Sequence, residues 1–200
     1  HGAGGADFMD GTVDAVITAC TTHMKYGTTS ILPTTLTSTD EELRENIENI
    51  ERARNSWEEI PEILGIHLEG PYFSMEQKGA QDARYIKHPK SDEYARILDN
   101  FPSIVRWTLA PEIPGGLNMG RELKLRGLIV SMGHTNAVYE DVIQATLNGF
   151  SLVTHLFLAM SRLVRKNAVM FPGVAESSLL LDQLDVEVIA DGKHLPPSIL

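Results

Sequence analysis

Residues able to bind a divalent metal ion stand at the ends of several short apolar segments of this chain. Glu69 ends the run in Ile-His-Leu-Glu-Gly-Pro, His134 follows Val-Ser-Met-Gly, and His155 follows Leu-Val-Thr. A carboxylate and two imidazoles suit zinc or another divalent first-row ion, and three protein ligands leave one position for water, as in catalytic sites. Such an ion lowers the pKa of its water and polarises a substrate carbonyl. The residue types therefore predict a catalytic metal centre formed by Glu69, His134 and His155.

Each of these residues also has an ordinary structural explanation. A single histidine at a strand end is more often a hydrogen-bonded structural residue, and a glutamate before Gly-Pro is more often part of a turn or cap. The metal site is favoured because the three residues fall at equivalent ends of three strands. A further strand end carries Asp191 and His194 in Ile-Ala-Asp-Gly-Lys-His. His67, two residues before Glu69, either lines the same site or packs in the core.

The elements that position these residues alternate between short β-rich segments and helical stretches. We expect strands at residues 29–33, 63–68, 105–109, 128–132, 152–155 and 186–190. We expect helices at residues 12–26, 40–55, 91–100, 116–126 and 138–148. Thr39 is the expected cap of the second helix, and Gly27 and Gly149 follow the ends of the first and the last. This alternation predicts an α/β fold with a parallel sheet.

The spacing of the strands, roughly 25–40 residues, is that of a βα unit. His1 would end a seventh strand, and an eighth would follow Leu200, so we expect an incomplete (β/α)8 TIM-type barrel with both ends missing. We treat residues 1–200 as a single, truncated domain. A doubly wound open sheet is the alternative that the alternation alone does not exclude. Two long loops, at 70–89 and 157–175, would lie at the carboxyl ends of the strands, where barrels build their active sites.

The composition narrows the class of protein. Seventeen Lys and Arg against 27 Asp and Glu give a net charge of −10, whereas a nucleic-acid-binding surface would be basic. Cys20 is the single cysteine, so an intrachain disulfide is excluded, which suits the cytoplasm; we expect a buried, inert thiol. Apolar runs all fall short of the roughly 18–20 residues that span a bilayer.

Eight segments of the chain, in their order and spacing, carry a family resemblance. They are HGAGGADF at 1–8, GTTSILPT at 27–34, GIHLEGPY at 65–72, KGAQ at 78–81, LAPE at 109–112, GHT at 133–135, THLF at 154–157 and IADGKH at 189–194. With these segments the chain resembles the N-acetylglucosamine-6-phosphate deacetylases of the amidohydrolase superfamily. The resemblance implies that metal-activated water attacks the acetamide of an amino-sugar phosphate, giving acetate and the free amino-sugar phosphate, in amino-sugar catabolism.

The resemblance also assigns roles to residues. Glu69, His134 and His155 match the main metal ligands, and His1 matches a histidine that holds a second metal ion in some members. One or two ions are therefore expected, zinc first, with iron or another divalent ion as alternatives. The family's general acid/base is an aspartate on the eighth strand, beyond Leu200, so we assign no catalytic acid or base within this chain. Asp191 belongs to the preceding strand.

Substrate contacts carry over with departures. The matching positions are Ala80, Gln81, Leu158, Ala159 and His194. A histidine is common in the family where Gln81 stands, and asparagine is usual where Leu158 stands, so a contact there would need the leucine backbone N–H. The following loop, 161–173, looks about four residues longer than the family's Arg-Glu-Pro-Gly loop. Arg165 or Lys166 would replace its phosphate-binding arginine; the alternative is a solvated loop face.

Two alternatives stay open beside deacetylation of N-acetylglucosamine 6-phosphate. The first is an amidohydrolase that acts on another N-acetyl sugar, such as N-acetylgalactosamine 6-phosphate. The second is a non-catalytic relative that binds metal or sugar. The resemblance further implies a homodimer, and a small β-sandwich built from chain ends that these 200 residues do not include.

Overall fold

The computed structural model describes residues 1–200 apart from the side chain of Lys166, so the predicted phosphate contact of Lys166 lies outside the described residues. Contacts divide the chain into two compact units. The first unit comprises His1–Pro71, Gln81–Ile86 and Lys90–Trp107; the second comprises Tyr72–Ala80, Lys87–Pro89 and Thr108–Leu200. A single domain over residues 1–200 stays a prediction.

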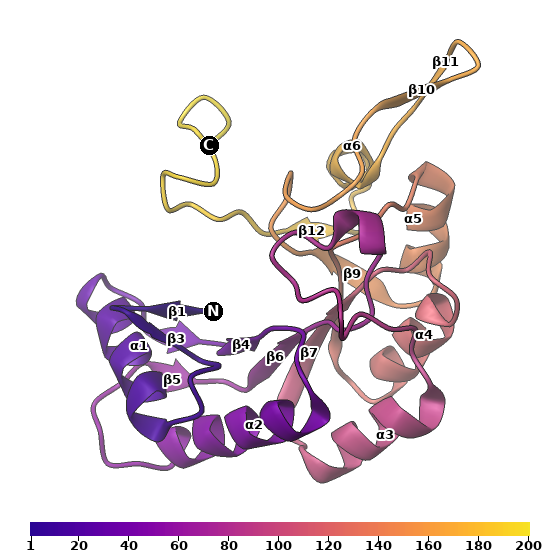
Figure 1. Cartoon of the computed structure of the whole chain (residues 1–200). Helices are drawn as coiled ribbons and strands as arrows, with labels where there is room; N and C mark the ends of the chain where they lie inside the picture. The colour runs from indigo at the N-terminus through magenta and orange to yellow at the C-terminus, as the bar shows by residue number, and fades with distance from the viewer. The chain divides into compact units, whose positions relative to one another are not determined.

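The first unit begins with a short hairpin and two helices (Figure 1). Its elements are β1 (Gly2–Ala3), β2 (Ala6–Asp7), α1 (Val13–Lys25), β3 (Ser30–Ile31), β4 (Thr34–Thr35), α2 (Asp40–Arg54), β5 (Glu62–Ile63), β6 (Ile66–Glu69), α3 (Ser91–Asn100) and the first residues of β7 (Ile104–Leu109). β3 pairs with β5 and β4 with β6, both in parallel, and β6 lies beside β7 in the sheet order.

The start of α2 shows how local sequence sets an element of this unit. The Thr39 hydroxyl accepts a hydrogen bond from the Glu42 backbone N–H, and the Glu42 carboxylate accepts one from the Thr39 N–H, which forms a capping box. The predicted cap is therefore confirmed. α2 packs against α1, and the buried apolar side chains between elements of this unit include Val16, Ala19, Cys20, Ile47, Ile50, Ala53, Ile66 and Leu68.

The second unit carries the rest of the sheet and its covering helices. Its elements are the 3-10 turn η1 (Met75–Gln77), the end of β7, α4 (Gly116–Leu125), β8 (Ile129–Met132), α5 (Tyr139–Leu147), β9 (Phe150–Val153), β10 (Val164–Lys166), β11 (Val169–Phe171), α6 (Val174–Leu180) and β12 (Asp185–Val186). The sheet order is β7, β8, β9, β12, and β9 pairs in parallel with both β8 and β12. α4 and α5 contact β9, whose Phe150 and Val153 are buried.

Two predicted strands are interrupted in the structure, each for a physical reason. The segment predicted at 29–33 forms only β3, and β4 begins just beyond it, after Pro33, which has no backbone N–H to donate to a ladder. The segment at 63–68 becomes β5 and β6, separated by Gly65. A Cβ at Gly65 would lie 2.6 Å from the methyl carbons of Val105, so the neighbouring strand approaches too closely for a side chain there.

The end of the chain differs most from the prediction. The strand predicted at 186–190 is only Asp185–Val186. Two further backbone hydrogen bonds follow at Glu187, whose N–H donates to the Val153 carbonyl and whose carbonyl accepts the Leu156 N–H. The loop at 157–175 holds an unpredicted antiparallel hairpin, β10–β11, and the start of α6. Among the described residues, none of the helices is both long and apolar enough to cross a membrane.

Candidate metal centre

Glu69 is the last residue of β6, a strand in which all four side chains are buried. Its side chain is 4% exposed. The Trp107 indole N–H donates to the carbonyl of Gly70 at 2.8 Å, which fixes the chain just beyond the glutamate. The Gln81 side-chain amide donates to Glu69 Oε1 at 3.0 Å, and His1 Nε2 lies 3.4 Å from Glu69 Oε2. The carboxylate is thus held on both oxygens within the first unit.

His1 is oriented by its second ring nitrogen. Nδ1 lies 3.2 Å from the carbonyl of Thr34, and a carbonyl can only accept, so Nδ1 carries a hydrogen. Desolvation alone would lower the pKa of His1, but the hydrogen bond and negative charge of Glu69, with the Thr34 carbonyl, outweigh it and raise that pKa. The side chain remains 38% exposed. His1 thus contacts Glu69, and its predicted role as a ligand of a second metal ion stays a prediction.

His134 follows β8 and the glycine at 133, with a left-handed backbone (φ 49°). Its Nδ1 lies 2.8 Å from the carbonyl of Gln77, which can only accept, so Nδ1 carries a hydrogen and Nε2 is the ring nitrogen available to a metal ion. Its own carbonyl accepts the Ser74 N–H at 2.9 Å. The Phe73 ring packs on it with centroids 4.5 Å apart. The imidazole is therefore fixed in position and in tautomer.

A buried carboxylate fixes the backbone just after His134. Glu112 accepts hydrogen bonds from the Thr135 hydroxyl at 2.5 Å and from the Asn136 N–H at 2.6 Å. Burial raises the pKa of Glu112, although these two hydrogen bonds oppose the shift. A left-handed conformation costs a non-glycine residue about 1–2 kcal/mol, so bonds that hold this segment offset strain at His134.

His155 follows β9 and also has a left-handed backbone, with φ 40°. Its Nε2 lies 3.2 Å from His134 Nε2, and the two rings meet nearly at right angles, 88°, with centroids 4.9 Å apart. The two nitrogens share a hydrogen bond whose donor depends on the tautomer, and with the hydrogen of each ring on Nδ1 both Nε2 lone pairs would be available to one cation.

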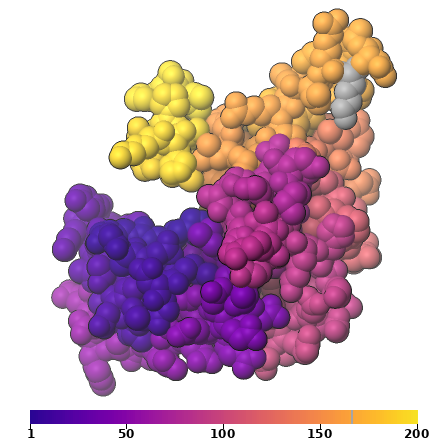
Figure 2. All heavy atoms as spheres, in the orientation of Figure 1, coloured from indigo at the N-terminus to yellow at the C-terminus, as the bar shows by residue number. Residues whose placement is uncertain are grey.

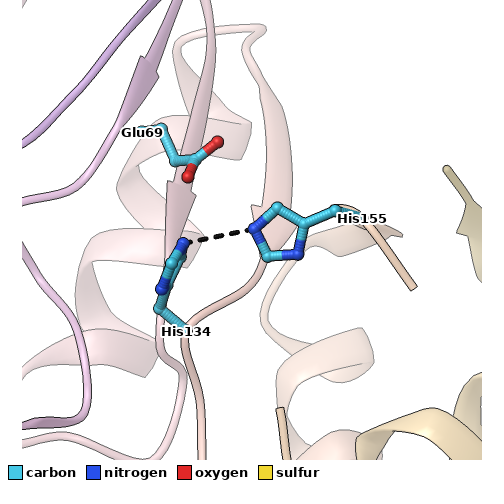
Figure 3. Close-up of side chains that lie close together, drawn as sticks. All are labelled: Glu69, His134 and His155. Atoms are coloured by element: carbon cyan, nitrogen blue, oxygen red, sulfur yellow. Dashed lines mark hydrogen bonds between the residues drawn. The ribbon is translucent and has the colours of Figure 1, made fainter. Parts of the chain in front are cut away.

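Glu69, His134 and His155 each offer one ligand atom, and these atoms all lie within 4.8 Å of one another (Figure 3). The set holds one carboxylate and two imidazoles, which are donors that zinc and similar divalent ions accept. Each of the three residues ends or follows a parallel strand, as predicted. The donor chemistry and the tautomer of His134 therefore fit a bound metal ion.

Comparison with known proteins places this arrangement in a family. The sequence model of the amidohydrolase family matches residues 9–199. The chain belongs to the amidohydrolase family. The α/β architecture with a parallel sheet is that of its structural neighbours, so the predicted fold class is confirmed.

Several curated relatives of this amidohydrolase chain are deacetylases. It is 32% identical over 203 residues to N-acetylglucosamine-6-phosphate deacetylase of Vibrio furnissii, covering 100% of this chain and 49% of the relative. It is 33% identical over 201 residues to the enzyme of that name from Bacillus subtilis, covering 98% and 50%. N-acetylgalactosamine-6-phosphate deacetylase of Shewanella sp. is 31% identical over 175 residues, covering 88% and 43%. The chain thus spans about half the length of the curated relatives it matches.

Solved structures agree with these relatives. A mutant of N-acetyl-D-glucosamine-6-phosphate deacetylase from Mycobacterium smegmatis, in complex with N-acetyl-D-glucosamine-6-phosphate, superposes with a TM-score of 0.89 at 32% identity. The match covers 50% of the Mycobacterium smegmatis chain and 100% of this chain. The Pasteurella multocida enzyme gives 0.86 at 34% identity, with 97% of this chain and 50% of that one covered. The family resemblance predicted from the eight segments is confirmed.

The residues predicted to bind substrate lie in different surroundings in the amidohydrolase chain. Ala80 is exposed after η1, whereas Gln81 is buried and bonded to Glu69. Leu158 donates its N–H to the carbonyl of His155 at 3.0 Å, so this donor is used within the turn. Ala159, with φ 46°, accepts the Thr135 N–H at 3.2 Å.

His194 and Arg165 are exposed. His194 Nδ1 lies 2.7 Å from Asp191 Oδ2, and Asp191 Oδ1 accepts the N–H groups of Lys193 and His194. Those bonds, from His194 first, lower the pKa of Asp191. Arg165 lies on β10, opposite Met170. The hairpin projects from the second unit, in orange in the space-filling view (Figure 2). The structure thus places both side chains in solvent-accessible positions.

Three contributors to the site were missed in the sequence. They are the Thr37 backbone N–H, which donates to Gln81, the Gln77 carbonyl, which accepts from His134, and the Glu112 carboxylate, which accepts from the Asn136 N–H. Only Glu112, within the segment LAPE, left a side-chain signal. The other two act through main-chain atoms, which every residue type supplies.

Proposed function

We propose that the protein containing this chain is a metal-dependent deacetylase. It would hydrolyse the N-acetyl group of N-acetylglucosamine 6-phosphate to glucosamine 6-phosphate and acetate, in amino-sugar catabolism. The observation that carries the proposal is the grouping of Glu69, His134 and His155 at strand ends in a chain whose relatives bear that name. The ligand-bound Mycobacterium smegmatis relative supports an amino-sugar phosphate as substrate.

The metal ion would be held by Glu69, His134 and His155, and we propose zinc, with iron or another divalent ion as alternatives. When bound, the ion lowers the pKa of water and polarises the acetamide carbonyl. Water oxygen bonds to the carbonyl carbon, the C–N bond breaks, and the nitrogen leaves as an amine after gaining a proton. The residues of this chain hold and orient the proposed metal ligands. The Gln77 carbonyl sets the tautomer of His134, and Gln81 and His1 contact Glu69. The proton carrier is proposed to lie beyond Leu200.

The number of metal ions held at this site is a separate question. His1 Nε2 lies 3.4 Å from Glu69 Oε2, which supports a role for His1 in holding a second ion. Counting metal per subunit in the full-length protein tests this. We expect one or two equivalents, and replacing His1 with alanine lowers the count only if two are bound.

Further parts of the proposal concern substrate contacts, assembly and location. Arg165, on the exposed β10–β11 hairpin, is proposed to contact the substrate phosphate, and Ala80, Leu158, Ala159 and His194 the sugar phosphate. A homodimer follows from the family resemblance. A cytoplasmic location rests on the single cysteine, which excludes an intrachain disulfide. The acidic net charge of −10 argues against nucleic acid as a partner.

N-acetylgalactosamine 6-phosphate is the second candidate substrate. The Shewanella relative that carries this activity in its name is 31% identical, close to the values for the glucosamine enzymes. The unpredicted hairpin stands where the resemblance places the phosphate loop, so the chain differs from its family in the region expected to select the sugar.

The decisive experiment measures acetate release by the full-length, zinc-loaded protein from both N-acetyl hexosamines, with and without the 6-phosphate. We expect turnover of N-acetylglucosamine 6-phosphate above the other three sugars. Faster turnover of N-acetylgalactosamine 6-phosphate selects the second candidate. Equal or better turnover of unphosphorylated sugars rejects both phosphosugar assignments. Metal binding without any acetate release identifies a non-catalytic relative.

The metal assignment is tested separately with Glu69→Gln. This variant loses a charged ligand, so we expect the zinc content after dialysis to fall, together with acetate release. Glu62→Gln is the matched control, because Glu62 is an exposed carboxylate on β5. Unchanged zinc content in folded Glu69→Gln would remove Glu69 from the ligand set.

A further inference from the structure

Gln81 is a buried amide, 4% exposed, whose two polar atoms are both engaged. Its Oε1 accepts the backbone N–H of Thr37 at 2.8 Å, and its Nε2 donates to Glu69 Oε1 at 3.0 Å. All three residues belong to the first unit. The side chain therefore joins the loop after β4 to the carboxylate at the end of β6.

The direction of the amide follows from chemistry as well as from its placement. A backbone N–H can only donate, so the atom of Gln81 that faces Thr37 must be the carbonyl oxygen. The NH2 group then faces Glu69, whose Oε1 accepts its hydrogen bond. The Thr37 N–H thus disfavours the flipped amide, in which Gln81 would turn its NH2 group toward another donor, and keeps the Gln81 NH2 group directed at Glu69. A hydrogen bond to a charged acceptor is also stronger than one between neutral groups.

We propose that Gln81 is a positioning residue of the metal site, which holds the Glu69 carboxylate in the orientation that a bound metal ion requires. This inference rests on the proposed function, because it assumes that Glu69 is a ligand. Outer partners that fix a ligand's orientation contribute to metal affinity, and their removal typically weakens it by about 10- to 100-fold. Gln81 acts through Glu69 and is not itself a ligand of the metal ion.

The proposal differs from the role that the family resemblance gives to this position. A sugar contact would make Gln81 matter for the KM of the substrate and leave metal affinity unchanged. A positioning role makes it matter for metal affinity in the absence of any substrate. The burial of Gln81 and the two bonds that engage its amide favour the second role.

Two variants of the full-length protein separate these roles. Gln81→Met conserves length and volume but removes both the donor and the acceptor. Gln81→Asn keeps the amide but is one methylene shorter, so it cannot reach Thr37 and Glu69 together. Gln144→Glu is the control, because Gln144 is an exposed side chain on α5. The thermal unfolding midpoint of each metal-free protein shows whether it is folded.

The readout is the zinc dissociation constant, measured by competition with a chelator without substrate. We expect it to rise by about 10- to 100-fold in Gln81→Met and Gln81→Asn and to stay unchanged in Gln144→Glu. At saturating zinc, KM for N-acetylglucosamine 6-phosphate should match that of the unsubstituted protein. Unchanged zinc affinity in the folded variants, with a raised KM, overturns the proposal in favour of a sugar contact.

The same measurements distinguish this inference from the proposed function. If the unsubstituted protein binds zinc and releases acetate while both variants bind zinc equally well, only the role of Gln81 fails. If the unsubstituted protein neither binds zinc nor releases acetate, the proposed function fails and the inference falls with it.

Discussion

Replacing Gly133 with alanine tests whether packing beneath His134 sets metal affinity. A Cβ at this position would lie 2.8 Å from Thr108 Cγ2, well inside the roughly 3.5–4.0 Å of an ordinary carbon contact. Thr108 is fully buried, and its hydroxyl is bonded to the Thr154 hydroxyl at 2.8 Å, so it cannot turn away without breaking that pair. Overpacking of this kind costs about 1–3 kcal/mol.

The strain can be relieved in two ways, and both can be measured. If His134, the next residue, moves to relieve the strain, metal binding is weakened. A cost of about 1–3 kcal/mol corresponds to a loss of roughly 5- to 150-fold in zinc affinity. Strain that remains in the fold lowers the unfolding midpoint by about 2–4 °C per kcal/mol. We expect both effects in Gly133→Ala, recorded by chelator competition and by thermal unfolding of the metal-free protein.

Gly127→Ala is the matched control for stability. Gly127 has φ 84°, so alanine there is strained by about 1–2 kcal/mol, but nothing lies within 4 Å of the added Cβ. It also lies before β8, at the end of the strand opposite His134. This control should lose stability and retain zinc affinity. If Gly133→Ala is folded and binds zinc as tightly as the control does, the packing argument for His134 is wrong.

Three further predictions concern other parts of the chain. Burial raises the pKa of Glu112 above its ordinary value of 4.5, so the folded protein holds this proton more tightly than the unfolded chain and loses stability as pH rises through that interval. Glu112→Gln should remove this loss of stability, because the amide does not titrate and can still bond to Thr135 and Asn136. Urea unfolding from pH 4 to 7 measures the effect. The same pH dependence of stability in both proteins would contradict the prediction. Burial raises the pKa of Cys20 to about 11, so a thiol reagent at pH 8 should label this cysteine only after denaturant is added. Fast labelling of the folded protein would contradict this and show that α1 opens. Thr39→Ala should lower the free energy of unfolding by about 1 kcal/mol through loss of the capping box, and no change would mean that the Thr39 cap is not stabilising.

The sequence predicted the site better than it predicted the contacts that support it. Glu69, His134 and His155 were found because parallel strands place their carboxyl ends at one edge, and the run of apolar residues marks each strand. The α3 bounds and the Thr39 cap were predicted because their signals lie within a few residues of one another. Local rules therefore sufficed for α3, for the start of α2 and for the strand ends that carry the three proposed ligands, but not for α6 or β12.

Other features depend on distant residues or on the main chain. Gln81 meets Thr37 across 44 positions of sequence, and its partner is a backbone N–H that carries no residue-type signal. The interruption at Gly65 depends on the approach of Val105, which is visible only once the strands are assembled. The loop after His155 was read from its length, which shows an insertion but not the hairpin that the inserted residues form.

The β10–β11 hairpin has an evolutionary consequence. Its two strands pair with each other, and Asn167 and Ala168 close them with positive φ angles of 49° and 65°. Residues can be added to or removed from such a ribbon without shifting the strand ends that carry His134 and His155. Under the proposed function, in which this hairpin contacts the substrate, changes in its length would alter the range of substrates while the strand ends that carry His134 and His155 stay unchanged.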